Sequence, residues 1–430
     1  MSTLKVNKLR DTAGSTDAIV LDPNGGAVLA GVTTISTARI TTGITTSIQV
    51  GGGVTISESG IEASGIGITC ASINGTQIGG RRNIIINGAM NVAQRNTSST
   101  SSGYKTVDRF KVSSGGTDET PTQSQADVAS GTTPYTEGFR KSYKIQNGNQ
   151  TSGAGEDDYI VIDYFVEAQD IATSGWNYTS SSSFITLSFW VKSSVAQNFY
   201  GSIKTSDGTE YNYPFETGSL SADTWTKVTK TISGNSNLQI DNNNGQGLRI
   251  RLVPFRGTSA TGSVTLNQWG AYDVSVQYPD NTSTFYTTND ATFEMTGVQL
   301  EVGSQATPFE HRSFAEELTL CQRYFTKTYD QDSYAGTAEY AGAFQQRSGT
   351  SSTTAVFSLV LPVLMRTTPT VVTYGPTAAT NASGKIRGSG DAVITATVDA
   401  RTSSRTIGLS YTPNQSNTFA SGHYTADAEL

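Results

Sequence analysis

The chain has little cysteine, histidine or charge. Its 430 residues include two cysteines, Cys70 and Cys321, and two histidines, His311 and His423. Charged residues make up 15%, against about 25% in ordinary soluble domains, and the formal net charge is −7. Two distant cysteines cannot form a disulfide framework. Neutralising phosphates requires clustered Lys and Arg, so the composition also excludes a nucleic-acid binder.

Long apolar runs are missing as well. The longest, from Val356 to Met365, is interrupted by Pro362, whereas a membrane-spanning helix needs about 20 apolar residues. The N-terminus reads Met-Ser-Thr-Leu-Lys-Val-Asn and lacks the apolar stretch of a signal peptide. We therefore expect no membrane insertion and synthesis in a cytoplasm. An aromatic content of 9% speaks against a disordered polyelectrolyte.

Glycine is abundant, with 44 residues, and Thr, Ser and Asn accompany it. From Gly31 to Gly80 the charged residues are Arg39, Glu58 and Glu62, and single Ile or Val residues alternate with Thr, Ser and Gly. This pattern predicts very short strands. One such chain buries too little apolar surface to fold alone, so residues 31–82 are predicted to form an intertwined β shaft of several chains. The alternative is a flexible linker.

Residues 83–312 contain repeated strand-like segments with turn signals between them. In Phe184–Val191 the residues alternate, which predicts a core face made by Ile185, Leu187, Phe189 and Val191. Many such strands over this length indicate a jelly-roll β-sandwich. Residues 331–430 are predicted to form a smaller C-terminal β-sandwich. The fold class is therefore all-β. The strands expected toward the end of the chain lie at 263–266, 271–276, 293–302, 355–374, 392–398 and 406–411.

A helix is predicted within residues 313–330. Ser313 and Glu316 have the spacing of a capping box, in which the Ser hydroxyl accepts from a free amide. Apolar residues follow at spacings of four, three and four, which is a heptad seam. The seam is either a trimer contact or one face of a helix packed on its own sandwich. Its members are Phe314, Leu318, Cys321 and Phe325.

Candidate catalytic residues are scarce in the sequence. His311 is predicted to be a surface loop residue, His423 a tail residue, and Cys321 a small buried apolar residue. The acidic cluster of residues 156–158 with Asp163 favours a solvated loop over a hydrolytic carboxylate pair. Residues 241–247 partly imitate a calcium loop but lack its bidentate Glu, so an Asn/Gly turn is favoured. We expect no catalytic residue, no metal and no cofactor.

Exposed aromatic residues among polar neighbours are candidates for glycan recognition. Sugar rings stack their C–H faces on aromatic rings, while Asn, Gln and Asp bond the hydroxyl groups. Low charge density suits a neutral or weakly charged sugar, and several copies of a binding site increase avidity. The candidates are Trp176, Tyr178, Trp269, Tyr272, Tyr334 and Tyr340.

Several motifs resemble a module repeated in bacteriophage tail fibres, which is similar to the carbohydrate-binding jelly rolls of glycan-active proteins. The resemblance covers roughly residues 83–325. The end of the chain resembles the distal domain of such fibres. The segments that carry these resemblances are Asn83–Met90 with Asp108-Arg109-Phe110, Leu187–Lys192, Thr296–Gly303, Ala306–Glu310, Cys321–Phe325, Leu361–Thr370 and Thr425–Leu430.

The resemblance implies a homotrimeric tail fibre located in the virion. Residues 1–30 would attach it to the phage tail or to an adaptor protein, and the C-terminal β domains would bind host surface polysaccharide or lipopolysaccharide. Three chains rather than two are implied by the family alone. Two other functions stay open: a structural virion part, such as a head fibre or an adaptor, and a polysaccharide depolymerase.

Overall fold

The computed structural model describes residues 81–347, 350 and 354–430, and eight short strands before them. The chain divides into two compact units, Met1–Cys70 and Ala71–Leu430. The short strands pair antiparallel as β1-β2-β3, β4-β5-β6 and β7-β8. Two predictions fall on residues outside the described part of the chain. One is that several chains share the axis of the shaft, and the other is that residues 1–30 attach the chain to a phage tail or adaptor. These strands are β1 (Lys8–Arg10), β2 (Asp17–Leu21), β3 (Ala27–Leu29), β4 (Ser47–Val50), β5 (Val54–Ser57), β6 (Gly60–Ala63), β7 (Ser72–Ile73) and β8 (Thr76–Gln77).

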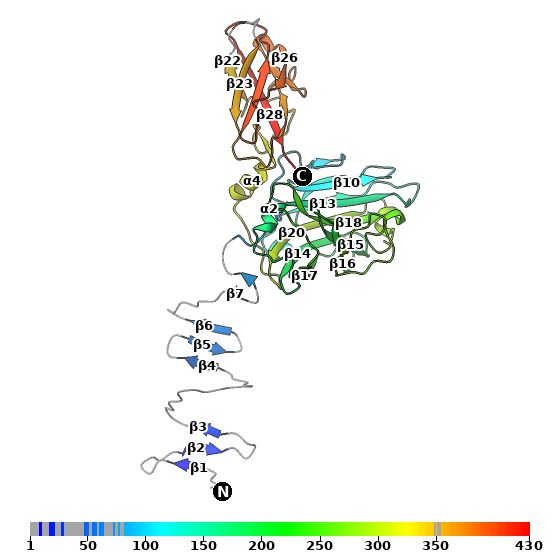
Figure 1. Cartoon of the computed structure of the whole chain (residues 1–430). Coiled ribbons are helices and arrows are strands. Elements are labelled where there is room, and N and C mark those ends of the chain that lie inside the picture. Colours follow the sequence, from blue (N-terminus) through cyan, green and yellow to red (C-terminus); the bar gives the residue numbers. More distant parts are fainter. Residues whose placement is uncertain are drawn as a thin grey trace. The chain divides into compact units, whose positions relative to one another are not determined.

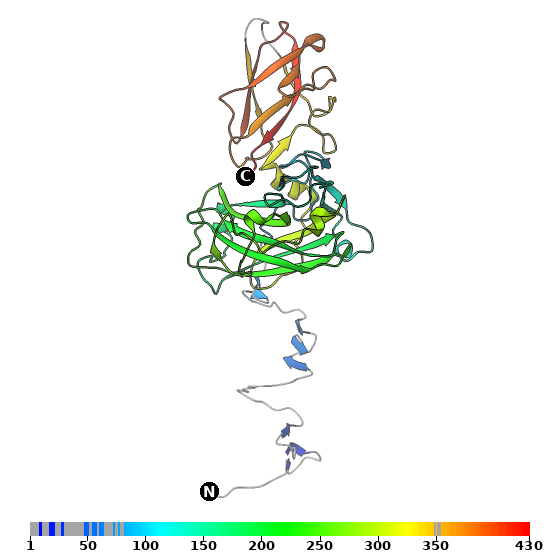
Figure 2. The same ribbon diagram turned by 90° about the vertical axis from the view of Figure 1, so that its right-hand side faces the viewer.

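Two six-stranded antiparallel sheets form a β-sandwich (Figures 1 and 2). The first sheet has the order β10 (Phe110–Gly115), β13 (Tyr159–Glu167), β18 (Gln246–Arg256), β15 (Asn198–Thr205), β16 (Tyr211–Ser219) and β19 (Gly270–Ala271). The second has the order β17 (Thr226–Ser233), β14 (Phe184–Ser193), β20 (Thr292–Val302), β12 (Lys141–Gln146), β11 (Thr122–Asp127) and β9 (Ser98–Ser99). The predicted all-β jelly-roll sandwich is confirmed.

The core lies between the two sheets and follows the predicted alternation. Four residues of β14 were predicted to face the core, and all four are buried in one cluster with residues of the first sheet. They are Ile185, Leu187, Phe189 and Val191. The other face of β14 is also buried, since Thr186 Oγ1 donates to Gly303 O at 2.8 Å. Asn83 Nδ2 likewise donates to Val298 O at 3.1 Å. The outer face of the second sheet is therefore covered by the segments that precede and follow the sandwich.

Residues 257–283 form mostly loop and 3-10 helix η1 (Thr258–Ala260), apart from the two residues of β19. The strands predicted at 263–266 and 271–276 are wrong. Tyr278 of this loop is fully buried against Val161 and Val253, whose side chains point away from the main core. The loop thus covers part of the outer face of the first sheet.

Among the described residues, no helix has the length and apolar character to cross a membrane. Helix α4 (Phe314–Gln322) begins as predicted, with the Ser313 hydroxyl accepting from Glu316 N at 3.3 Å. The other helices are α1 (Thr133–Thr136), α2 (Ala168–Ala172), α3 (Thr284–Thr287) and 3-10 helix η2 (Ser389–Asp391).

The predicted heptad seam is not continuous. Cys321 is fully buried against Ile86 and Val92 of the same chain, with Leu318 packed beside it. Phe314 is 47% exposed, and Phe325 lies beyond the helix, in the next strand. The packing of α4 on its own chain, which was the alternative, accounts for Cys321, and the helix ends too early to include Phe325.

The C-terminal residues form a further antiparallel sheet. Its order is β21 (Phe325–Lys327), β28 (Phe419–Asp427), β25 (Lys385–Arg387), β26 (Val393–Val398), β27 (Thr406–Tyr411) and β23 (Ala355–Val360), and both β22 (Phe344–Arg347) and β24 (Thr370–Tyr374) also pair with β28. Strands are present within each predicted stretch of this region, but 355–374 contains two strands, β23 and β24, and residues 361–369 between them are not strand. Sequence reasoning missed β21, β22, β25 and β28, of which β28 pairs with β21, β22, β24 and β25.

His423 lies in β28 and corrects the prediction of a tail residue. Its ring is fully buried and stacks on Tyr329 with centroids 3.8 Å apart. Nε2 donates to Glu339 O at 2.9 Å, and Nδ1 lies 3.1 Å from Thr328 Oγ1. Burial holds the pKa of His423 below its usual value, although Glu339 and Asp330 favour the charged form. A neutral, structural histidine fits these contacts.

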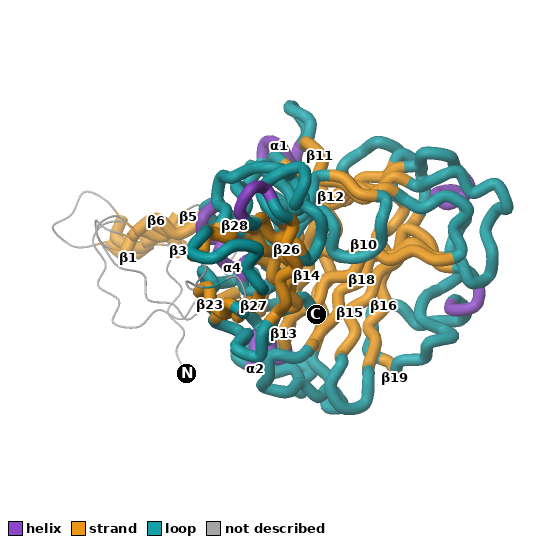
Figure 3. The backbone as a smooth tube through the Cα atoms, turned by 90° about the horizontal axis from the view of Figure 1, so that it is seen from above, coloured by secondary structure: helices purple, strands orange, loops and turns teal. Residues whose placement is uncertain are grey.

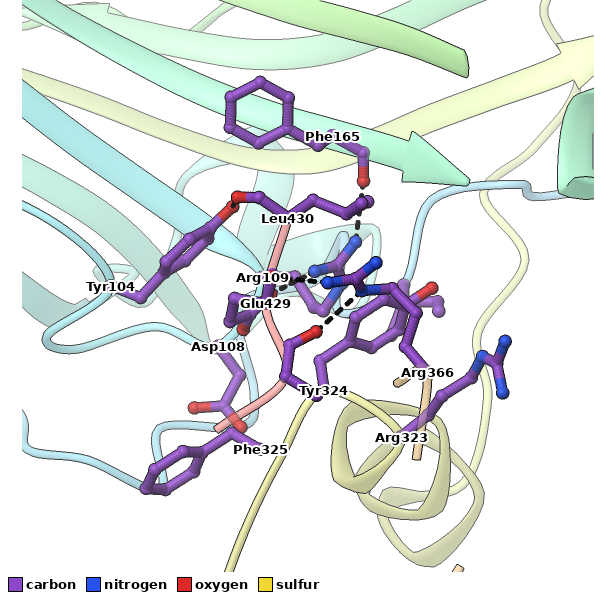
Figure 4. Close-up of polar contacts among 12 residues, drawn as sticks. Tyr104, Asp108, Arg109, Phe165, Arg323, Tyr324, Phe325, Arg366, Glu429 and Leu430 are labelled. Carbon is purple, nitrogen blue, oxygen red and sulfur yellow. Dashed lines mark hydrogen bonds and ion pairs between the residues drawn. The ribbon is translucent and has the colours of Figure 1, made fainter. Parts of the chain in front are cut away.

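The sandwich and the C-terminal sheet are joined by residues 428–430 (Figure 4). Arg109 of the sandwich forms an ion pair with Glu429, and its Nη2 donates to Phe165 O at 2.6 Å. Its guanidinium lies 3.3 Å from the centroid of the Tyr324 ring. Arg366 Nε donates to Ala428 O at 2.7 Å. We call this set of contacts the joint.

Candidate functional site

Two of the predicted glycan-binding residues belong to the core. Trp176 is 3% exposed, and its Nε1 lies 3.4 Å from Ser183 O. Tyr178 packs edge-on against Trp176 and donates its hydroxyl to Ile240 O at 3.3 Å. A buried indole presents no free face, so the position of Trp176 does not fit the predicted stacking role, whereas Tyr178 is half-buried beside the core.

Trp269 and Tyr272 lie close together beside β19. The Trp269 indole packs edge-on against Tyr213, and Nε1 donates to Ser233 O at 2.7 Å. The ring of Tyr272 lies 4.7 Å from Lys204 Nζ. Both rings are half-buried. Tyr272 thus neighbours the polar surface of the sandwich that is described next, whereas Trp269 packs against the core.

Tyr334 and Tyr340 lie in the C-terminal region. Tyr340 is 58% exposed, with Arg387 Cζ 5.7 Å from its ring centroid. Tyr334 is half-buried and has Lys327 Nζ 5.1 Å from its ring centroid. The structure therefore places the six predicted aromatic residues in three separate surroundings rather than in one site.

On the outer face of the first sheet, three polar side chains lie side by side because they belong to register partners on neighbouring strands. Arg249 of β18 pairs in register with Lys204 of β15, and Lys204 pairs with Asn212 of β16. Figure 3 shows these three strands side by side. Since side chains alternate across a strand and Leu248 and Ile250 point to the core, Arg249 points outward. We call Arg249, Lys204 and Asn212 the polar row.

Two residues further along β18, the same face of the sheet holds an ion pair. Asp163 of β13 pairs in register with Arg251 of β18, and two bonds join them: Nε to Oδ1 at 2.7 Å and Nη2 to Oδ2 at 2.8 Å. Arg249 Nε lies 3.8 Å from the same carboxylate. Asp163 is therefore buried and paired, so the predicted solvated surroundings are wrong for this residue.

A hollow of about 380 Å³ opens beside the polar row. Asn212 is 6% exposed and lines it, and its Nδ2 donates to Gln277 O at 3.3 Å. Asn212 Oδ1 and Gln277 Oε1 are buried acceptors without a hydrogen-bond partner, as are the donors Nε and Nη2 of Arg249. The other residues that line the hollow are Pro214, Ser263, Val264, Thr265, Gln268, Gly270, Ala271, Asp273 and Val276.

Of the three residues with these unpartnered atoms, Asn212 belongs to the lining of the hollow, whereas Arg249 and Gln277 do not. Buried polar groups are normally bonded, so unpaired ones at a hollow call for an explanation such as a ligand or water. Burial also lowers the pKa of Lys204, although its bond to Glu210 favours the charged form. The residues of the polar row were missed from the sequence. The alternation in Leu248-Arg-Ile-Arg251 could have placed both arginines outward, but not beside Lys204 and Asn212.

The other sequence candidates have structural roles. Asp158 is buried and accepts from Tyr286 Oη at 2.9 Å, so it too departs from the predicted solvated loop, whereas Glu156 and Asp157 are exposed. Residues 241–245 form a loop, in which Asn243 Oδ1 accepts from Gly245 N at 2.7 Å. His311 is exposed, as predicted. Within the described part of the chain, no group of three or more His, Cys, Asp or Glu could hold a metal.

Comparisons with known proteins give distant structural likeness only. No protein-family model matches the sequence, and no curated protein matches it. The enzymatically active domain of tailspike protein 4 from bacteriophage CBA120 is 10% identical, with a TM-score of 0.27, over 51% of this chain and 21% of that one. A family 4 carbohydrate-binding module is 12% identical, with a TM-score of 0.26, over 50% of this chain and 97% of that one.

A family 11 carbohydrate-binding module from Clostridium thermocellum, solved with a mixed-linked tetrasaccharide, is 12% identical, with a TM-score of 0.23, over 49% of this chain and 99% of that one. The chain thus spans about a fifth of the tailspike domain and nearly all of each module. Identities and TM-scores this low carry no argument about what the chain binds. The functional argument depends on its own residues.

Proposed function

We propose that the chain is a glycan-binding protein whose sandwich holds saccharides at the hollow beside the polar row. The observation that carries this proposal is the unpartnered Oδ1 of Asn212, a residue that lines the hollow. A sugar hydroxyl both donates and accepts, so a saccharide in the hollow supplies the donor that this oxygen lacks. Tyr272, beside Lys204, supplies the apolar ring surface.

We further propose binding without hydrolysis. Hydrolysis of a glycosidic bond uses two carboxyl groups, one as acid and one as base or nucleophile. On this face, both oxygens of Asp163 are held by Arg251, and Glu210 is bonded to Lys204. These pairings support a role in holding a saccharide rather than cleaving it.

The role of Asn212 is tested by Asn212→Leu, which keeps the branching of the side chain at Cγ and removes the amide. We expect the variant to bind neutral oligosaccharides about tenfold more weakly, since one lost hydrogen bond at a buried site costs about 1–2 kcal/mol. The measurement is calorimetric titration with cellotetraose, laminaritetraose and maltotetraose, with chromatography of the mixtures to detect any shortened product.

Asn289→Leu, at an exposed position, is the matched control and should bind like the original chain. If no oligosaccharide binds, or if both variants lose affinity equally while remaining folded, the hollow is not the glycan site. Shortened oligosaccharides would instead favour the depolymerase.

In the virion we propose the chain as a homotrimeric phage tail fibre, attached through residues 1–30 and recognising the host surface with its C-terminal β domains. The Ile and Val pattern of residues 31–82 and the family resemblance of the motifs support this assignment. A structural adaptor or head fibre would share the trimer but not the glycan binding.

Light scattering tests the trimer. With 45.5 kDa for one chain, three chains give about 137 kDa, because the shaft needs several chains to bury its apolar residues. A mass of one chain would contradict the trimer and leave the glycan proposal standing, since the polar row lies within a single chain.

A further inference from the structure

We propose a second glycan site, for a saccharide that carries a carboxylate or a phosphate, in the hollow between the sandwich and the C-terminal sheet. This hollow has a volume of about 280 Å³. It lies next to the joint shown in Figure 4, which labels Tyr104 and Phe325 from its lining. Clefts at domain boundaries are preferred places for ligands. The inference is independent of the polar row.

Both domains build the walls. Gln94, Asn96 and Tyr104 come from the sandwich, ahead of β10. Lys327 comes from β21 and pairs in register with Thr425 of β28, which also lines the hollow. The remaining lining residues are Arg95, Ser99, Lys105, Phe325, Ala335, Tyr374 and Asp427. The hollow therefore exists only when the joint holds the two domains together.

The charges of the lining are not balanced. Arg95 is paired, with Nη2 3.0 Å from Asp427 Oδ2 and 3.4 Å from Glu429 Oε1. Lys327 Nζ donates only to the carbonyl oxygens of Gln331, at 3.1 Å, and Ser333, at 2.6 Å.

Lys105 is exposed, and within the described residues neither Lys105 nor Lys327 forms an ion pair. Asp427 is the one acidic residue of the lining, and Arg95 engages it. Burial lowers the pKa of Lys327, although the carboxylates of Asp108, Asp332, Glu339 and Asp330 favour its charged form. The lining thus holds two lysines that form no ion pair, and Lys105 is the more exposed of them. An anionic group of a ligand supplies the missing charge, and charge-assisted hydrogen bonds are the stronger kind.

The uncharged lining residues fit the uncharged part of a saccharide, namely its ring and hydroxyl groups. Tyr104 is held in place because its hydroxyl donates to Leu430 O at 3.0 Å, so its ring is a fixed surface rather than a mobile one. Tyr374 packs edge-on against Tyr329. Asn96 Oδ1 accepts from Thr97 N at 2.8 Å, which leaves the amide Nδ2 as a donor for a hydroxyl. Two aromatic rings, amides and two lysines together favour an acidic saccharide over a bare anion.

The test uses the full chain and three probes: a tetrasaccharide of β-1,4-linked glucuronate, a phosphorylated mannose tetrasaccharide and neutral cellotetraose. We expect Lys105→Gln to weaken binding of the anionic probe about fivefold, as one partly exposed charge pair is worth up to about 1 kcal/mol. Cellotetraose binding should not change. Raising the salt concentration should weaken only the anionic probe, because salt screens exposed charges. The two anionic probes distinguish a uronate source from a phosphate source.

Lys144→Gln is the matched control, since Lys144 lies in β12 of the second sheet. Thermal unfolding of each variant confirms that it is folded. Loss of anionic binding in Lys105→Gln but not in Lys144→Gln or Asn212→Leu supports the proposal. Equal losses in both lysine variants, or no binding of either anionic probe at low salt, overturn it. Loss of cellotetraose binding in Asn212→Leu bears on the polar row alone, so the two proposals fail separately.

Discussion

Replacing Arg109 with methionine is expected to lower the free energy of unfolding by about 3 kcal/mol, because the buried carboxylate of Glu429 loses one of its two ion-pair partners and keeps only Arg95, at 3.4 Å. Arg109 is fully buried, and Glu429 is 5% exposed at its side chain. Although burial opposes the charged form, Glu429 raises the pKa of Arg109 well above its usual value. In Arg109→Met the buried carboxylate of Glu429 keeps the more distant guanidinium of Arg95 and loses the one that forms the closer pair. This loss costs stability.

The same substitution removes more than one charge pair. Arg109 Nη2 bonds Phe165 O, and the guanidinium covers the ring of Tyr324. Its backbone φ of 74° is in the left-handed region, which few non-glycine residues occupy. We therefore expect Arg109→Met to separate the unfolding of the C-terminal sheet from that of the sandwich. Calorimetry should show two transitions where the original chain shows one, and limited proteolysis should cut near residues 323–330.

Arg401→Met provides the control, because Arg401 is 61% exposed in its pair with Asp399 and exposed pairs contribute about 0–1 kcal/mol. The double variant Arg109→Met with Glu429→Gln should be more stable than Arg109→Met alone, since it also removes the carboxylate that lost its closer partner, while Arg95 keeps Asp427 at 3.0 Å. Equal stability of Arg109→Met and Arg401→Met would contradict the role assigned to the joint.

Arg109 also indicates the structural role of the sequence motifs that carry the family resemblance. It belongs to Asp108-Arg109-Phe110, one of the segments on which the family resemblance depends. Asp108 accepts from Gln94 Nε2 and from its backbone N–H, and Asn87 bonds Val92. These two segments, Asn83–Met90 and Asp108–Phe110, thus hold the sandwich and its neighbours together. A motif search finds them because they are distinctive, but their contacts are long-range and could not be predicted from spacing.

The core face of β14 and the start of α4 could be predicted because each depends on local pattern, namely alternation and a capping residue. The fate of single aromatic residues could not. Trp176 and Tyr340 both lie in polar stretches of sequence, yet one is buried and the other is exposed, because burial depends on which loop folds over which sheet. The polar row could not be predicted for the same reason, since it too depends on tertiary structure. Arg249, Lys204 and Asn212 become neighbours only through the order and register of three strands distant in sequence.

Asp163→Asn is expected to destabilise the sandwich by about 3 kcal/mol, the lower end for a buried pair because the Arg251 side chain is 16% exposed. The amide keeps the shape of the carboxylate but not its charge, so Arg251 and Arg249 lose their shared counter-ion. Two arginines on the same face of β18 then repel each other, and burial adds to the cost. Urea unfolding measures the loss, which should change little with salt, because the two arginine side chains are 11% and 16% exposed and salt screens buried charges weakly.

Asp127→Asn is the control for this change, because its pair with Lys141 is exposed, with 80% exposure at the aspartate side chain, and should contribute little. Replacing both partners, as Asp163→Leu with Arg251→Met, removes the two charges together and should recover most of the stability, since well-packed apolar residues often match a buried ion pair. If the double variant were as unstable as Asp163→Asn, the pair would matter for its packing rather than its charge. Because Arg251 neighbours the polar row on the same strand, recovered stability with unchanged cellotetraose binding would show that the ion pair shapes the sheet, while the polar row binds the saccharide.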